Sequence, residues 1–144
     1  MSRPEAGLWD FLRPRLPPGT HASRIESLDT APGFPDVHYT LNGFTGSMEL
    51  KCNPFPVGEY AFSGNKHGLR KSQKDWIRDE IEAGGRVILV LQAYVLIYFL
   101  NGHHYAALED MKTTEVEKKA EIVWARNGAC DTRALGRLMM GGKQ

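Results

Sequence analysis

Polar and apolar residues alternate almost strictly over residues 36–51, on both sides of Asn42-Gly43. Alternation with period two predicts two half-buried strands, and an Asn-Gly pair between them predicts a two-residue hairpin with a type I′ turn. In that register Asp36 faces Glu49 across the ladder, with the Cβ atoms roughly 5 Å apart. Lys51 shares the face of Glu49, because side chains alternate along a strand. The other face, expected to point to the core, consists of Val37, Tyr39, Leu41, Phe44, Met48 and Leu50.

Further patterns predict helices and buried strands around this hairpin. Capping boxes at Ser2–Glu5 and Ser72–Asp75 predict two helices, the first ended by Pro14 and the second by Gly84-Gly85. The other predicted elements are a helix or strand over 21–29, a short strand over 59–62, continuous apolar strands over 86–91 and 95–100, a tight turn at Asn101-Gly102 leading into a strand over 103–108, an amphipathic helix over 111–126 and a last helix capped by Thr132.

These elements predict an α/β fold, with a central mixed sheet of about four or five strands flanked by helices. At 144 residues the chain is long enough to bury a core as one domain. We expect a single domain over 1–144, with a core of about 20–108 and a C-terminal helical extension of about 109–144.

Composition narrows the function classes only slightly. A net charge of +1 counts mildly against a nucleic-acid binder but allows a local basic surface. Cys52 and Cys130 lack metal-ligand spacing and no signal peptide is present, so we expect reduced thiols in a cytoplasmic protein, in the host cytoplasm if a phage encodes it. The apolar stretch 87–100 is too short to span a bilayer. The adjacent His103 and His104 would point to opposite faces of a strand and predict no zinc site.

The paired carboxylates carry the candidate chemistry. Asp36 and Glu49, opposed on one face, repel each other unless something compensates their charge. A divalent cation would do so, since hard oxygen ligands suit magnesium or manganese. Lys51 would then stabilise developing negative charge or orient a water molecule, which is the equipment for metal-dependent phosphodiester hydrolysis. The alternative is a hairpin that simply turns polar residues to solvent.

The same residues resemble a known family. Pro35-Asp36 followed about a dozen residues later by Glu49-Leu50-Lys51 resembles the PD-(D/E)xK nuclease superfamily. The wider pattern, over roughly residues 24–100, is similar to that of the virus-type replication-repair (VRR-Nuc) nucleases and small phage endonucleases, near the Holliday-junction resolvases. Its pieces are Gly33-Phe34-Pro35-Asp36, Glu49-Leu50-Lys51, Gln73 with Trp76, and Gly84-Gly85 before the apolar run 86–91.

This resemblance implies a restriction-endonuclease-like core and a DNA endonuclease that depends on Mg²⁺ or Mn²⁺. Selectivity for junction or branched DNA and a phage origin are its finer implications. An upstream carboxylate would complete the metal site, with Glu26 as first choice and Asp29 as second; the alternative for Glu26 is a solvated surface residue. The implied catalytic residues are Asp36, Glu49, Lys51, Glu26 and Gln73, and the implied metal ligands are Asp36, Glu49, Glu26 and the main-chain carbonyl of Leu50.

The expected partner is DNA, with no small-molecule cofactor and no membrane. A homodimer would suit a resolvase, which must cut two strands symmetrically. The rival interpretation is a nucleic-acid-binding or assembly protein that keeps the fold and cleaves nothing. The basic residues expected to contact substrate phosphates are Arg24, Lys66, Arg70, Lys71 and Lys74.

Overall fold

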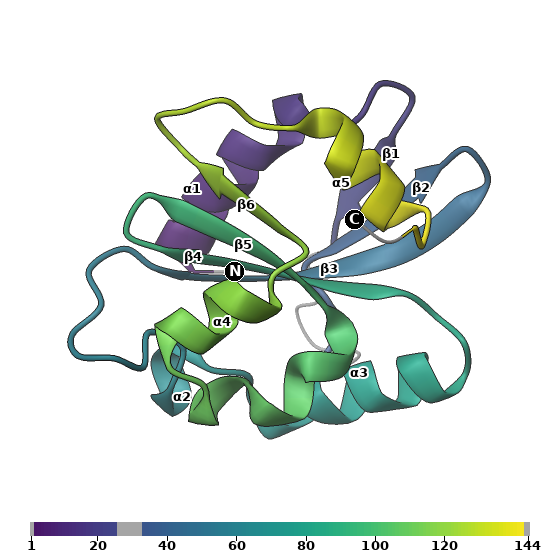
Figure 1. Cartoon of the computed structure of the whole chain (residues 1–144). Helices are drawn as coiled ribbons and strands as arrows, with labels where there is room; N and C mark the ends of the chain where they lie inside the picture. The colour runs from purple at the N-terminus through teal and green to yellow at the C-terminus, as the bar shows by residue number, and fades with distance from the viewer. Residues whose placement is uncertain (1, 26–32, 143–144) are drawn as a thin grey trace.

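The computed structural model describes residues 2–25 and 33–142, which form a six-stranded mixed sheet with helices on both faces (Figure 1). This confirms the predicted α/β class, with six strands instead of four or five. In the described residues β3 and β4 pair in parallel and every other neighbouring pair is antiparallel. The strands lie in the sheet in chain order: β1 (His21–Arg24), β2 (Val37–Leu41), β3 (Phe44–Asn53), β4 (Val87–Ala93), β5 (Leu96–Asn101) and β6 (Ile122–Ala125).

The helices divide between the two faces of the sheet, as Figure 1 shows. Helices α1 and α5 contribute Leu8 and Leu135 to one apolar cluster, whereas α3 and α4 contribute Ile77 and Val116 to the other. None of the described helices is long and apolar enough to cross a membrane. The helices are α1 (Arg3–Leu12), η1 (Arg13–Arg15), α2 (Gly64–His67), α3 (Lys71–Glu82), η2 (Gly102–Asp110), α4 (Thr113–Lys119) and α5 (Thr132–Met139).

The predicted hairpin is confirmed as β2 and β3. Asn42 and Gly43 have φ angles of 51° and 83°, as a type I′ turn requires, and Val37 pairs with Met48 in the predicted register. The predicted core face is buried except for Phe44, which is 45% exposed. That assignment is wrong: Phe44 directly follows the turn, and the guanidinium of Arg86 lies over its ring, 5.9 Å from the centroid.

Helix α3 connects the parallel strands β3 and β4, as a parallel pair requires. The capping box predicted to start at Ser72 is wrong. The helix begins at Lys71, because the Gln73 side chain accepts the main-chain N–H of Arg70 and so caps the helix at Arg70. The capping box between Ser2 and Glu5 at the start of α1 is confirmed.

The largest error concerns the C-terminal third. Residues 111–126 do not form one helix: α4 ends at Lys119 and β6 pairs with β5, so the predicted helical extension supplies an edge strand of the sheet. Ile122 and Trp124 are buried and Val123 between them is exposed, as in a strand. This alternation covers only three residues, too few to be recognised in the sequence among the charged residues around it.

Three shorter predictions in loops and caps are also wrong. The Asn101 side chain accepts the N–H of His103 and starts the 3₁₀ helix η2 where a strand was expected over 103–108. Residues 59–62 form turns instead of a strand. Asp131, not Thr132, caps α5, because its side chain accepts the N–H of Ala134.

Candidate active site

Strand β3 extends further than its partner β2, and this leaves a gap in the sheet beside the Glu49-Leu50-Lys51 motif. The β2–β3 ladder ends at Val37 and Met48, while β3 continues to Asn53 next to β4. The N–H of Leu50 therefore has no strand partner, and it donates to Oδ2 of Asp36 at 2.8 Å. The carbonyl of Leu50 faces the same gap, because the N–H and C=O of a strand residue point to the same edge. The Pro-Asp motif and β3 thus meet at the gap.

Glu49 lies buried under α3 with one of its oxygens unsatisfied. Its side chain is 1% exposed, and Oε1 accepts a 2.7 Å hydrogen bond from Nε2 of Gln73. Oε2 is buried and has no hydrogen-bond partner. Nζ of Lys51, itself 5% exposed, lies 4.0 Å from Oε1. A buried carboxylate oxygen without a partner is costly and indicates a missing ligand.

Gln73 links the start of α3 to β3. Its Oε1 accepts the N–H of Arg70 at 2.9 Å, and its Nε2 donates to Glu49. These two contacts use the oxygen as acceptor and the nitrogen as donor, which fixes the orientation of the amide. The family resemblance implied a place for this glutamine among the catalytic residues, and the structure brings it into direct contact with Glu49.

The electrostatics of the pair favour either a proton or a cation. Burial of the carboxyl group, and after it the charge of Asp36, raises the pKa of Glu49 well above its usual value, although the ammonium of Lys51 opposes this. Burial also raises the pKa of Asp36, and the hydrogen bond from Leu50 is the largest opposing effect. Raised pKa values mean that a second negative charge in this site is unfavourable, and a divalent cation between the two carboxyl groups would remove that cost.

The residues present fit such a cation. Asp36, Glu49 and the carbonyl of Leu50 offer hard oxygen ligands around the gap, and the orphaned Oε2 of Glu49 lacks a partner that an ion would supply. Within residues 2–25 and 33–142, no three His, Cys, Asp or Glu side chains are grouped closely enough to hold a metal ion. An ion here would complete its shell with water, as magnesium commonly does.

Sequence reasoning missed one acidic residue near this gap, Glu5. Its side chain is 9% exposed, and its charge contributes to raising the pKa of both Asp36 and Glu49. Oε2 of Glu5 accepts the N–H of Ser2 at 2.9 Å, so the residue is also part of the α1 capping box. The capping pattern accounts for Glu5 in the sequence. Its effect on the two carboxyl groups becomes visible only in the structure, where α1 packs against β3.

The other predicted residues fall into three groups. Glu26 and Asp29 lie outside the described residues. Lys71 and Lys74 have ion-pair partners, Asp75 at 2.7 Å and Glu109 at 3.0 Å. The basic side chains that are exposed near the ends of β1, α2 and α3 are Arg24, Lys66 and Arg70.

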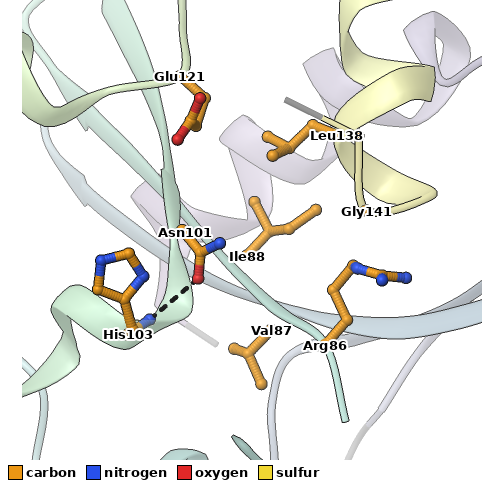
Figure 2. Close-up of a pocket in the computed structure, with 9 residues that line it drawn as sticks. Arg86, Val87, Ile88, Asn101, His103, Glu121, Leu138 and Gly141 are labelled. Atoms are coloured by element: carbon orange, nitrogen blue, oxygen red, sulfur yellow. Dashed lines mark hydrogen bonds between the residues drawn. The ribbon is translucent and has the colours of Figure 1, made fainter. Parts of the chain in front are cut away.

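A separate cavity of about 400 Å³ opens at the start of β4 (Figure 2). Its lining includes the apolar residues Val87, Ile88 and Leu138 and the charged residues Arg86 and Glu121 (Figure 2). None of the predicted site residues lines it. The candidate active site is therefore the gap beside β3, which is defined by its buried polar groups.

Comparisons with known proteins add a likeness of fold. No protein-family model and no curated protein matches the chain. Among solved structures, the chain is similar to Hjc, a Holliday junction resolvase from the archaeal hyperthermophile Archaeoglobus fulgidus. The identity is 16%, the match covers 70% of this chain and 76% of that chain, and the TM-score is 0.47.

Gly33 controls the approach of the Pro-Asp segment to α3, and its replacement by alanine should damage the site. Gly33 has a φ of +92°, and a Cβ there would collide with the main-chain carbonyl of Ser72. We expect G33A to lose ~1–3 kcal/mol from backbone strain alone, with a further loss from the collision, measured by urea unfolding. The control is G19A, because Gly19 has a similar φ of +86° with open space around it. Equal losses in the two variants would contradict the close approach.

Proposed function

We propose that this protein is a metal-dependent DNA endonuclease that hydrolyses phosphodiester bonds. The observation that carries the proposal is the buried Glu49, whose Oε2 has no partner and whose pKa is raised by burial and by Asp36. A carboxylate pair of this kind, with an ammonium beside it and a main-chain carbonyl facing the same gap, supports cation binding and phosphoryl chemistry.

In this proposal Asp36, Glu49 and the carbonyl of Leu50 hold Mg²⁺ or Mn²⁺. When bound, such an ion polarises a phosphoryl oxygen and lowers the pKa of a water molecule. Gln73 keeps Glu49 in position through its 2.7 Å hydrogen bond. Glu26 remains the predicted upstream carboxylate, and Glu5 adds negative charge that favours a cation in the gap.

Lys51 supplies a fixed positive charge at the reacting phosphate. Its ammonium is almost fully buried and lies 4.0 Å from Oε1 of Glu49, so its position is restricted. An ammonium in a site shielded from water stabilises negative charge on phosphate oxygens far more than one in solution does. Lys51 would also orient the attacking water by a hydrogen bond.

The substrate phosphates would be bound by exposed basic side chains around the gap. Arg70 caps α3 beside Gln73, and Lys66 lies on α2, which packs near β3. We also propose that the enzyme is selective for branched DNA and that it is related to the VRR-Nuc and small phage endonucleases. A homodimer would be the unit that cuts two strands. Arg24, Lys71 and Lys74 remain predicted contacts, although the two lysines would have to share their charge with Asp75 and Glu109.

The rival function, a DNA-binding module without catalysis, is less well supported. A module without catalysis has no need to place the buried Glu49 beside a second carboxyl group, because a neutral or apolar residue at position 49 would remove the desolvation cost.

A cleavage assay tests the proposal. Wild type and E49A are incubated with labelled duplex, single-stranded, flapped and four-way-junction DNA in Mg²⁺, Mn²⁺ or EDTA. We expect wild type to cut at least one substrate with metal and not in EDTA, and E49A to cut none. Failure of wild type to cut any of these DNAs, with equal binding by both proteins, would favour the module without catalysis.

A further inference from the structure

The loop that follows the catalytic strand exposes apolar side chains to an unusual extent. Phe55 is 83% exposed, Val57 is 94% exposed and Tyr94, from the β4–β5 turn, is 59% exposed. The Tyr94 hydroxyl donates to the carbonyl of Pro56 at 3.1 Å, which joins the turn to the loop between Phe55 and Val57. We call these three side chains the apolar platform.

The platform is held in place by main-chain and side-chain bonds. Pro54 and Pro56 restrict the loop, and Nδ2 of Asn53 donates to the carbonyl of Ala61 at 2.8 Å. Tyr94 adopts a φ of 55°, which is strained for a bulky residue, and its carbonyl accepts Nε2 of Gln92 at 2.7 Å. Strain of this kind persists where the surrounding structure enforces it, often at ligand-binding positions.

The position of the platform relates it to the proposed active site. Asn53, at the end of β3, lies four positions after Glu49, which corresponds to about 13 Å along a strand. Phe55 follows two residues later. In Figure 1 the loop after β3 and the β4–β5 turn lie at the same side of the molecule, with α2 directly below. The platform therefore lies beyond the end of β3, set apart along this strand from the proposed metal ligands.

Positive charge lies next along the chain. Lys66 on α2 and Arg70 at the start of α3 are exposed basic residues. The one acidic residue of the loop, Glu59, has an ion-pair partner in Lys112 at 3.8 Å. Aromatic rings followed by basic side chains are the combination that single-stranded nucleic acid requires, since rings stack on bases while cations bind phosphates.

We propose that the apolar platform binds unpaired bases of a branched or gapped DNA and so selects the substrate of the proposed nuclease. This inference rests on the proposed function and adds the recognition element. Phe55 and Tyr94 stack on the unpaired bases, and Lys66 and Arg70 hold the adjoining phosphates. Paired bases within a duplex are already stacked and offer no free face to Phe55. The platform therefore favours DNA with a single-stranded segment next to a duplex.

The test measures base stacking and cleavage separately. DNA forks carrying 2-aminopurine at unpaired positions, and matched duplexes, are titrated with E49Q protein in EDTA, so that binding is observed without cleavage. E49Q is compared with the double variant E49Q/F55A. The control is E49Q/F44A, because Phe44 is 45% exposed and lies at the opposite end of β3. We expect F55A to weaken fork binding about tenfold and remove the fluorescence change, with duplex binding within about twofold and F44A unchanged.

A second variant and a cleavage readout complete the test. Y94G relieves the positive φ and should fold at least as stably by thermal melting, yet should weaken fork binding in the same direction. In otherwise wild-type protein, F55A should lower cleavage of forks relative to duplex. Unchanged fork binding in F55A, or equal losses for fork and duplex, would overturn the platform. The platform would also be overturned if F55A changed the sedimentation of the protein without changing fork binding, because the platform would then be a contact between protein copies. Absence of cleavage by wild type would instead contradict the nuclease.

Discussion

E49Q is expected to abolish DNA cleavage, with a loss of about 10³-fold or more in rate, because a metal ligand contributes several kcal/mol to the transition state. The same substitution should stabilise the protein in EDTA at neutral pH. The pKa of Glu49 is raised above its usual value of 4.5 in the folded protein, so the folded state retains a proton that the unfolded chain releases. The stability of metal-free wild type therefore falls as pH rises above about 4.5.

Glutamine at position 49 does not titrate, and it keeps a neutral side chain of the same size for Gln73. Urea unfolding in EDTA between pH 5 and pH 8 should show a falling free energy of unfolding for wild type and a flatter profile for E49Q. The control is E82Q, because Glu82 is an exposed residue on α3 and should leave both profiles and cleavage unchanged. Parallel pH profiles for wild type and E49Q would contradict the raised pKa of Glu49.

K51M is expected to lower the cleavage rate by about 10²–10³-fold while leaving Mn²⁺ affinity unchanged or slightly higher. The physical reason is that Lys51 would act on the phosphate and not on the metal ion. Its Nζ lies 4.0 Å from Oε1 of Glu49, so the ammonium would repel a cation that Glu49 holds. Single-turnover cleavage at saturating Mn²⁺, together with Mn²⁺ titrations, separates the two effects.

The matched control for Lys51 is K118M, since Lys118 is an exposed lysine in the last turn of α4. It should cut DNA at the wild-type rate. Loss of Mn²⁺ binding in K51M would show that Lys51 holds the carboxylate pair together instead of acting on the substrate.

Local chemistry explains why the centre of the fold could be predicted from the sequence. The turn at Asn42-Gly43 and the alternation around it determine the register of β2 and β3, and that register puts Asp36 one step beyond the ladder, next to Glu49. These signals act over a few residues and depend little on packing. The contact between Gln73 and Glu49 follows once α3 crosses over the catalytic strand.

The errors occur where packing decides the structure. Residues 122–125 follow the charged helix α4, which hides them in the sequence pattern. They nevertheless form β6, because Trp124 packs against Phe99 with ring centroids 4.8 Å apart. Glu5 looked fully explained by its capping box, and its proximity to the carboxylate pair depends on how α1 packs. The platform could not be predicted either, because exposure of Phe55 depends on the surroundings of the loop and not on the residue type.

Binding of Mn²⁺ to the gap beside β3 tests the central claim most directly. Electron paramagnetic resonance at pH 7.5 follows free Mn²⁺ during titration of wild type and D36N, in which the Leu50 N–H still finds an acceptor oxygen. We predict saturable binding by wild type that is lost or strongly weakened in D36N, with both proteins folded by thermal melting. No saturable binding by wild type, or equal binding by D36N, would contradict a cation site formed by Asp36 and Glu49.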